Sequence, residues 1–342
     1  MKAAVLEGVG GALIIRDVPV PTIGSDEVLV ATRTCGLCRT DLHIQDGLAY
    51  VPSLPHIPGH EPAGVVVEVG ASVTGLSVGQ RVVPHLFMAA RDCAFIRTGR
   101  HAQALHLAGI IGVTAPGGFA EYFKAPARNL LVLPAEVPFD AGGLVACAVI
   151  TAVHAYRRAS LHANDTAVVL GAGGIGQILI QILVGGGVRT IAVSRLAESL
   201  KLAEANRAAL TVPLAAPDAA DRVRAFAGSE YDGVDCVFDL VGTAATMQAA
   251  EGFVRRAGRI VVIGEEPQYP AIDTIRIAQR ELEIVGSRNG SLQDAADSLA
   301  MMSAGVIRPP IAQRFPLEDI NEALGLLRSG RARGRIVVTV AE

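Results

Sequence analysis

Midway along the chain runs the stretch Thr166-Ala-Val-Val-Leu-Gly-Ala-Gly-Gly-Ile-Gly-Gln-Ile-Leu-Ile-Gln-Ile-Leu183. Its five mostly apolar residues ending at Leu170 predict a short buried strand, and the apolar run after the glycines predicts a helix. The glycines between them, Gly171, Gly173 and Gly176, have G-x-G-x-x-G spacing. Such a turn between a strand and a helix is typical of dinucleotide binding. We therefore favour a cofactor site here over a purely structural turn.

Each glycine of this turn has a separate expected task. Gly171 permits the tight turn, Gly173 lets the backbone approach a pyrophosphate, and Gly176 lets the helix pack close to the strand. The helix N-terminus, at Gly174 and Ile175, offers free N–H groups and the positive end of the helix dipole to the phosphates. The turn is thus predicted to bind the phosphates of a dinucleotide.

The composition is that of a globular enzyme large enough for two domains. The chain has 342 residues, 51% hydrophobic and 4% aromatic, and a formal net charge of -3, which argues against a nucleic-acid partner. No apolar run reaches the length of a membrane span. Five cysteines without framework spacing indicate a reducing compartment, and we expect the cytoplasm.

The residues on both sides of the central turn differ in pattern. Before about residue 149, short β-rich runs separated by Gly and Pro predict a compact all-β or barrel-like unit. After it, helices and strands alternate, which predicts a doubly wound parallel sheet with ligand at the carboxyl ends of its strands. The predicted strands are Ala3–Leu6, Leu13–Asp17, Glu27–Arg33, Ala63–Val69, Phe119–Ala125, Thr166–Leu170, Thr190–Ser194, Val234–Asp239, Arg259–Gly264, Leu282–Gly286 and Arg335–Val340. The predicted helices include Glu198–Ala208, Ala219–Ala227, Ala244–Arg256, Leu292–Ala304 and Leu317–Ser329.

The first segment holds residue types that bind metals. Cys35-x-x-Cys38 taken alone fits a redox pair or half of a zinc knuckle, but no second C-x-x-C completes a structural site. A grouping of Cys38, His60 and Cys147 fits catalytic zinc, which takes three protein ligands and leaves one position open. Spacing alone leaves open the alternative of buried cysteines and a core histidine.

Several short motifs together resemble a known family. They are Cys38-Arg-Thr-Asp-Leu-His43, Gly59-His-Glu61, Gly118-Phe-Ala-Glu-Tyr122, Cys147-x-x-x-Thr151 and the turn Gly171–Gly176. In this order the chain resembles, nearly end to end, the zinc-dependent alcohol dehydrogenases of the medium-chain dehydrogenase/reductase superfamily. The resemblance implies an α/β fold: a GroES-like, β-barrel-type catalytic domain and a Rossmann cofactor domain with a doubly wound parallel sheet.

The resemblance also implies roles for the residues of these motifs. Cys38, His60 and Cys147 would bind the catalytic zinc, with Glu61 as a carboxylate beside the metal. Asp41 would accept a hydrogen bond from the far nitrogen of His60. Thr40 and His43 match a proton relay. The cofactor contacts would be Arg39, Thr151, Gly171, Gly173, Gly174, Ile175, Gly176 and Arg335, the last on the pyrophosphate. For Thr40, Asp41 and His43 the alternative is helix capping, and for Arg335 it is a solvent-facing charge at a strand edge.

One stretch departs from the family. Many relatives carry four cysteines for a structural zinc at positions that here hold Ala90, Cys93, Ile96 and Ala104. One thiolate cannot make a closed tetrahedral site, so we expect no structural zinc, and the lobe must be held by packing of Phe87, Phe95, Ile96 and Leu105. His101 and His106 lie nearby but off the pattern.

The cofactor choice depends on the end of the strand Thr190–Ser194. NAD-binding folds usually place Asp or Glu there to bind the ribose 2′-hydroxyl, whereas this chain has Ser194 followed by Arg195. A carboxylate would repel a 2′-phosphate, while Ser and Arg can bind it. We predict NADP, with NAD possible; the alternative is that Arg195 points to solvent and the site does not discriminate.

These observations predict three segments: a catalytic domain at 1–148, a dinucleotide-binding domain at 149–287 and a return segment of the catalytic domain at 288–342. The predicted activity is zinc-dependent hydride transfer between a nicotinamide cofactor and an alcohol, aldehyde or ketone. One rival is a zinc-free double-bond or quinone reductase of the same superfamily, and another is a non-catalytic nucleotide-binding protein. No nucleic-acid or membrane partner is expected, and the resemblance implies a homodimer or homotetramer.

Overall fold

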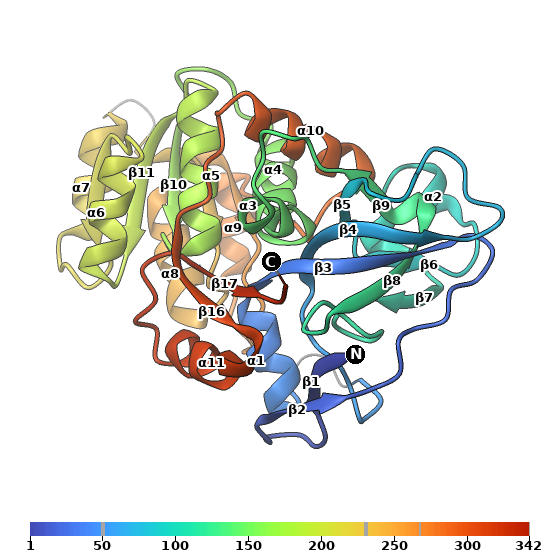
Figure 1. Cartoon of the computed structure of the whole chain (residues 1–342). Coiled ribbons are helices and arrows are strands. Elements are labelled where there is room, and N and C mark those ends of the chain that lie inside the picture. Colours follow the sequence, from blue (N-terminus) through green and yellow to red (C-terminus); the bar gives the residue numbers. More distant parts are fainter. Residues whose placement is uncertain (49–51, 229–231, 267, 342) are drawn as a thin grey trace. The chain divides into compact units, whose positions relative to one another are not determined.

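The computed structural model describes residues 1–48, 52–228, 232–266 and 268–341. The chain forms two compact units. The first unit comprises Met1–Ile150, Gly290–Gly305 and Pro309–Glu342, and the second comprises Thr151–Asn289 and Val306–Arg308. Figure 1 shows the second unit in green to orange and the chain ends, in blue and red, within the first. Each unit is described by itself below.

The second unit is built on the predicted parallel sheet, which has six strands in the order β12-β11-β10-β13-β14-β15. All its neighbouring pairs are parallel. Chain order reverses beside β10, the place where such sheets bind ligands. The strands are β10 (Thr166–Leu170), β11 (Arg189–Ser194), β12 (Leu210–Pro213), β13 (Val234–Asp239), β14 (Val254–Val262) and β15 (Glu283–Gly286). All five residues of β10 are buried, as expected for a central strand.

Helices connect these strands: α5 (Gly174–Gly185), α6 (Ala197–Ala205), α7 (Ala219–Ala227), α8 (Ala244–Phe253) and α9 (Thr274–Arg280). The predicted ends of two of these helices are wrong. The helix predicted to reach Ala208 ends at Ala205, where Asn206 caps it and Arg207 has φ of 66°. The helix predicted to reach Arg256 ends at Phe253, because β14 starts at Val254 and pairs there with β13 through a register shift. The short elements β12 and α9 were not predicted.

The first unit contains a seven-stranded sheet in the order β16-β17-β3-β4-β5-β9, with β8 also paired to β3. Its strands are β3 (Glu27–Leu37), β4 (Glu61–Val69), β5 (Arg81–Pro84), β8 (Tyr122–Pro126), β9 (Leu130–Val132), β16 (Ile311–Pro316) and β17 (Arg335–Thr339). Two hairpins complete it, β1 (Lys2–Leu6) with β2 (Leu13–Asp17) and β6 (Phe87–Ala89) with β7 (Leu107–Ile110). Strand β3 continues to Leu37, beyond the predicted end at Arg33, and so leads directly into Cys38.

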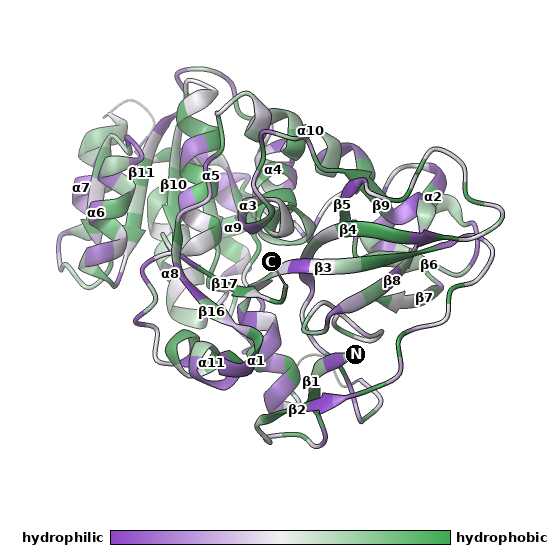
Figure 2. Ribbon diagram, in the orientation of Figure 1, coloured by the Kyte–Doolittle hydropathy of each residue, from purple (hydrophilic) through white to green (hydrophobic). Residues whose placement is uncertain are grey.

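The remaining helices are α1 (Arg39–Asp46), α2 (Ala94–Arg97), α3 (Phe139–Gly143), α4 (Ala148–Ala159), α10 (Leu292–Ser303) and α11 (Ile320–Arg328). Short 3-10 turns are η1 (His101–Gln103), η2 (Ala127–Asn129), η3 (Leu144–Ala146) and η4 (Leu317–Asp319). Helix α1 is largely hydrophilic in Figure 2, although four of its residues are buried. Among the described residues no single helix is long and apolar enough to cross a membrane; Phe139–Ala146 and Ala148–Ala159 pass that test only together, as a pair bent by 51°.

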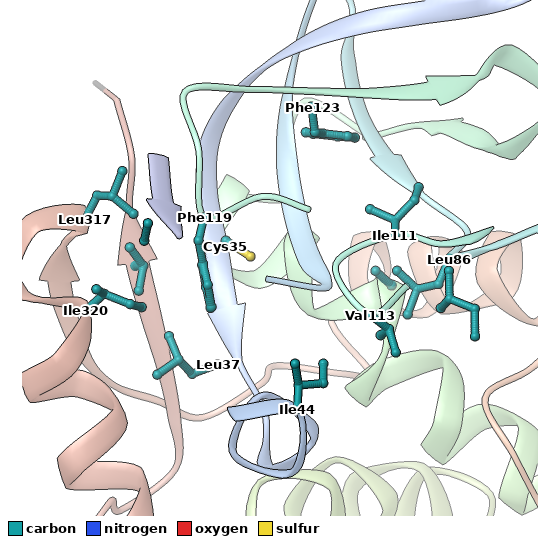
Figure 3. Close-up of a cluster of buried hydrophobic side chains, with 14 of the residues drawn as sticks. Cys35, Leu37, Ile44, Leu86, Ile111, Val113, Phe119, Phe123, Leu317 and Ile320 are labelled. Carbon is teal, nitrogen blue, oxygen red and sulfur yellow. The ribbon is translucent and has the colours of Figure 1, made fainter. Parts of the chain in front are cut away.

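The core of the first unit joins its two ends. Leu317 and Ile320, from the C-terminal segment, pack in one cluster with Leu37, Phe119 and Phe123 (Figure 3). Burial of a side chain of this size stabilises the fold by about 1.5–3 kcal/mol. The segment after residue 308 is therefore an integral part of the unit that contains β3 and helix α1.

Candidate metal centre and cofactor-binding turn

Three separate parts of the first unit bring four ligand-type side chains together. Cys38 directly follows the end of strand β3. His60 and Glu61 lie at the start of β4, and Cys147 lies between η3 and α4. Since Gly36 of β3 pairs with Glu61 of β4, the first two parts are neighbours by register. One ligand atom from each of Cys38, His60, Glu61 and Cys147 lies within 4.8 Å of all the others.

Asp41 connects two of these residues through its two carboxylate oxygens. Its Oδ2 accepts a hydrogen bond of 2.8 Å from the backbone N–H of Cys38, as part of the capping box at the start of α1. Its Oδ1 lies 3.0 Å from Nδ1 of His60, the contact that the resemblance implied. The other ring nitrogen, Nε2, is buried and has no hydrogen-bond partner among the described residues. His60 is therefore oriented with Nε2 available as a ligand.

The residues present fit a zinc ion. Two thiols, an imidazole and a carboxylate are ligands that zinc uses, and Nε2 of His60 and Oε1 of Glu61 are buried without partners in the described part of the chain. A hydrogen bond with Cys147 lowers the pKa of Cys38 well below its usual value and raises that of Cys147. Burial opposes charge on His60, but Asp41 and Cys38 outweigh it and raise the pKa of the ring. Metal binding must therefore release protons.

Glu61 is paired with Arg335, the first residue of β17. The guanidinium donates from Nη2 to Oε2 of Glu61, and the two side chains are 7% and 0% exposed. The alternative of a solvent-facing charge at a strand edge is wrong for Arg335. Burial raises the pKa of Glu61 to about 7 although Arg335 acts in the opposite direction. A side chain at Gly36 is excluded, because its Cβ would stand 2.1 Å from Oε2 of Glu61.

The sequence contained no direct signal for this ion pair, since 274 positions separate its partners. It follows from strand register. Strand β3 pairs on one side with β17, where Leu37 faces Ile336, and on the other with β4, where Gly36 faces Glu61. The first residue of β17 is thereby brought to the end of β3, next to the metal ligands.

Helix α1 carries the predicted relay residues. Thr40 is half-buried, with its Oγ1 3.8 Å from the Cys38 thiol, and His43 is buried. They are three residues apart on one helix, so their side chains share a face. Arg39 is exposed. Thr40 thus lies beside the Cys38 thiol, and the roles of all three residues remain predictions.

The lobe expected to lack a structural zinc lies between β6 and β7. Cys93 is half-buried before α2, and the His101 ring packs edge-on against that of His85 at 5.3 Å. Phe87 is buried, and the Arg100 guanidinium lies 4.9 Å from the centre of the Phe95 ring. The prediction that Leu105 holds the lobe by packing is wrong, because it is 69% exposed.

We predict one zinc ion per chain. Ala90, Ile96 and Ala104 stand where thiolates would be needed for a second ion, and one cysteine cannot hold zinc in a closed tetrahedral site. Elemental analysis of the purified protein should therefore give a ratio near one. Two tightly held zinc ions per chain would show that the 84–118 segment binds metal by residues other than the expected cysteines.

The glycine-rich turn of the second unit has the predicted form. Gly171 has φ of 100°, which favours glycine, and a Cβ on Gly176 would lie 2.3 Å from the carbonyl oxygen of Gly171. Gly173 is the N-cap of α5 and is exposed, and a Cβ there would meet no atom within 4 Å. Gly174 and Ile175, the first residues of α5, are half-buried. The turn thus offers an open backbone face at a helix N-terminus, which suits phosphate binding.

The other residues predicted to contact the cofactor differ in their exposure to solvent. Ser194 ends β11, is 8% exposed and accepts a hydrogen bond of 3.3 Å from the N–H of Leu196. Arg195 is exposed, and Thr151 is buried in α4. The hydroxyl of Ser194 thus already serves as an acceptor within the chain and retains its O–H for a ligand.

The sequence reasoning missed one buried carboxylate at the ligand-binding edge of this sheet. Asp239, at the end of β13, is fully buried and accepts hydrogen bonds from the N–H groups of Val241 and Gly242 at 2.9 and 3.0 Å. It also accepts one of 2.9 Å from Oγ1 of Thr246. The available signal was an aspartate directly after a buried strand, where short polar side chains organise turns.

Comparison with known proteins gives two family matches. Residues 24–135 match the family described as alcohol dehydrogenase GroES-like domain, and residues 215–338 match zinc-binding dehydrogenase. An alcohol dehydrogenase of Geobacillus stearothermophilus is 32% identical over 342 residues, covering 99% of this chain and 100% of that protein.

Solved structures agree over the whole chain. Acetophenone reductase from Geotrichum candidum, in complex with NAD, is 27% identical with a TM-score of 0.88, covering 99% of this chain and 97% of that one. A protein described as a zinc-binding dehydrogenase from Sinorhizobium meliloti 1021, bound to NADP, is 27% identical with a TM-score of 0.89, covering 99% of both. Of these two similar proteins, one was solved with NAD and the other with NADP.

Proposed function

This chain belongs to the zinc-containing alcohol dehydrogenase family of the medium-chain dehydrogenase/reductase superfamily, and from that membership we propose that it transfers a hydride between a nicotinamide cofactor and an alcohol, aldehyde or ketone. The observation that carries the proposal is the convergence of Cys38, His60, Glu61 and Cys147, with Asp41 on the far nitrogen of His60. Buried thiol and imidazole groups in this arrangement are the ligands of a catalytic zinc.

The charges of the ligands and of the ion pair beside them balance when zinc is held by Cys38, His60 and Cys147. Two thiolates offset the dication, and Arg335 offsets Glu61. The remaining carboxylate, Asp41, accepts hydrogen bonds from the Cys38 N–H and the His60 ring. A zinc ion held by these residues would supply a Lewis acid for the substrate oxygen, and a bound nicotinamide would supply the hydride donor or acceptor. Asp41 fixes the His60 ring, and Glu61 with Arg335 forms a buried ion pair beside the ligands.

The residues of α1 move the proton. In alcohol oxidation the Thr40 hydroxyl accepts the proton of the substrate hydroxyl and passes its own to His43, which delivers it to solvent. In carbonyl reduction the transfer runs in reverse. The i, i+3 spacing of Thr40 and His43 on one helix supports this role.

Replacing His43 by alanine should reduce alcohol oxidation most at low pH. Solvent base is scarce there, so the proton that His43 would carry has no substitute acceptor. Imidazole-type buffers should partly restore the rate, because they replace the missing base. The measurement is turnover against pH with and without such a buffer. A profile identical to that of the parent, without buffer rescue, would remove His43 from the mechanism.

A panel of substrates tests the proposed reaction. Purified protein is incubated with NADP or NAD and a series of alcohols, and with the reduced cofactors and aldehydes, ketones, quinones or activated double bonds. Nicotinamide absorbance reports turnover. Oxidation of alcohols or reduction of carbonyls supports the proposal. Turnover of only quinones or activated double bonds favours the zinc-free reductase, and cofactor binding without any turnover favours the non-catalytic nucleotide-binding protein.

For the cofactor we propose NADP over NAD. Ser194 and Arg195 stand where NAD-binding folds usually place a carboxylate, and Arg195 is exposed, so its guanidinium can reach a ligand. The O–H of Ser194 can donate to a 2′-phosphate while its oxygen accepts from Leu196. One charge-assisted hydrogen bond contributes about 1.5–3 kcal/mol.

The specificity constant should therefore favour NADP by roughly tenfold to a hundredfold. Exchange of Ser194→Asp together with Arg195→Ala should invert the preference, because the carboxylate repels the 2′-phosphate and can bind the ribose hydroxyl. Steady-state kinetics with both cofactors measures it. Use of NAD by the parent at least as efficiently as NADP would contradict this assignment.

Other expectations stay proposals. We propose a catalytic domain formed by 1–148 and 288–342 and a cofactor domain at 149–287. Arg39 and Thr151 are proposed as cofactor contacts, and Arg335 as the residue that pairs with the cofactor pyrophosphate. A cytoplasmic location and a homodimer or homotetramer are proposed as well. The partners expected are small alcohols and carbonyl compounds, without nucleic acid or membrane.

A further inference from the structure

Gln177 is a buried polar residue in the largely apolar helix α5, whose other polar side chain is that of Gln181. It is 1% exposed, and both hydrogens of its side-chain amide are used. Nε2 donates to the carbonyl oxygens of Ala172 and Ser199, each at 2.8 Å. Oε1 accepts from Nδ2 of Asn206, also at 2.8 Å. A glutamine fully satisfied in a core position fixes the groups that it contacts.

The groups held by Gln177 belong to the two segments proposed to bind the cofactor. Ala172 lies within the glycine-rich turn, and Ser199 lies in the first turn of α6. The segment Ser194–Ser199, which we name the ribose segment, begins where Ser194 accepts from Leu196 and ends at this carbonyl. Asn206 caps the other end of α6. The side chain of Gln177 therefore connects the glycine-rich turn to Ser199, near the start of α6, and to Asn206, at the end of α6.

The bond to Ala172 also orients a peptide group. In a trans peptide the C=O of Ala172 and the N–H of Gly173 point in opposite directions. Since Gln177 holds the carbonyl toward the buried side, the Gly173 N–H is directed to the opposite side. Gly173 is exposed, and a Cβ there would meet no atom within 4 Å. A donor aimed into open space at a helix N-terminus is what a phosphate requires.

We propose that Gln177 is a positioning residue that sets the glycine-rich turn and the ribose segment in the relative arrangement needed by one dinucleotide. The proposal rests on the proposed function, because it assumes that both segments bind the same cofactor. It assigns Gln177 no contact with the ligand. The adenosine part of the cofactor would reach the ribose segment, and its pyrophosphate would reach the turn. Loss of Gln177 should therefore weaken the binding of a dinucleotide, which contacts both segments, more than the binding of a ligand that contacts only one of them.

The test is the variant Gln177→Met, which keeps the length of the side chain and removes its hydrogen bonds. The dissociation constants of NADPH and NADH should rise about tenfold, as expected for loss of roughly one net hydrogen bond. The dissociation constant of adenosine, which lacks the phosphates and contacts only the ribose segment, should change less than about twofold, and turnover at saturating cofactor should change little. Titration calorimetry suits all ligands.

Two further variants separate positioning from stability. Ile180→Val removes one methyl group from the buried face of the same helix and should lower the melting temperature without changing any dissociation constant. Asn206→Ala, at a half-buried position, leaves the amide of Gln177 less constrained and should weaken dinucleotide binding about threefold. It provides the test if Gln177→Met does not fold.

Unchanged dinucleotide binding in a folded Gln177→Met protein would overturn the inference. Equal weakening of adenosine and dinucleotide binding would overturn it as well, because it indicates a purely local role. If Gln177→Met does not fold, unchanged dinucleotide binding in Asn206→Ala overturns it. If the parent protein binds neither NADPH nor NADH, the proposed function itself is contradicted, and the inference with it. If the parent binds them and Gln177→Met binds them equally well, only the inference is contradicted.

Discussion

Replacement of Cys38 by serine should lower both the zinc content and the turnover number, the latter by on the order of a thousandfold or more, while cofactor binding persists. A serine hydroxyl is a far weaker zinc ligand than a thiolate, and Cys38 is within 4.8 Å of the other ligand atoms. The glycine-rich turn belongs to the other compact unit, so the cofactor site has no reason to fail. Elemental analysis, steady-state kinetics and a cofactor titration measure the three quantities.

The matched control is Cys35→Ser, the same exchange three residues earlier. Cys35 is fully buried in β3 and is not one of the four converging residues. This variant should keep its zinc even where it loses some stability. A Cys38→Ser protein with near-normal turnover after treatment with a chelator would contradict the assignment of Cys38 as a ligand of a catalytic metal.

Replacement of Arg335 by methionine should destabilise the folded protein by about 3–5 kcal/mol, because it leaves the carboxylate of Glu61 as an unpaired buried charge. Methionine has a similar length and fills most of the volume, so lost packing contributes little. The double variant Glu61→Gln with Arg335→Met should recover much of this loss, since neither charge remains. Urea unfolding of the zinc-loaded proteins provides the comparison.

In the metal-free protein, the loss of stability caused by Arg335→Met should also depend on pH. The pKa of Glu61 is about 7 with the arginine present, and Arg335 holds it down, so the variant raises it further. A carboxyl whose pKa is raised by folding favours the folded state in acid and loses that contribution as pH rises. The penalty should be small near pH 5 and grow through neutrality. Equal stability of parent and Arg335→Met at all pH values would contradict this account, and so would a double variant as unstable as the single one. Either result would show that Arg335 does not stabilise the fold by compensating the buried charge of Glu61.

The sequence predicted the parts of the fold that depend on local pattern. Strand β10, its glycine turn and helix α5 were confirmed because five apolar residues, three glycines at fixed spacing and an apolar helix leave little choice. The side chains of Cys38, His60 and Cys147 were grouped through family motifs, and the structure brings them together. Periodicity alone would have left them as core residues.

Other features depend on contacts between distant segments and could not be read from local sequence. The pairing of Arg335 with Glu61 is set by the register of β17, β3 and β4. The junction of α8 and β14 at Val254 is set by pairing with β13, which overrides the helical pattern that continues to Arg256. Gln177 gave only the signal of a polar residue in an apolar helix. Two of its three partners, Ser199 and Asn206, belong to α6 and its cap, and they reach Gln177 because α5 and α6 pack against each other.

The central claim is that a zinc ion in the group formed by Cys38, His60, Glu61 and Cys147 is required for nicotinamide-dependent turnover of alcohols or carbonyl compounds. The most direct measurement follows nicotinamide absorbance with one substrate that the protein turns over, before zinc removal, after removal by a chelator, and after addition of one equivalent of zinc per chain. The account predicts that activity is lost with the zinc and returns with it, while the metal-free protein still binds the cofactor. Full activity in protein shown by elemental analysis to contain no metal would contradict it.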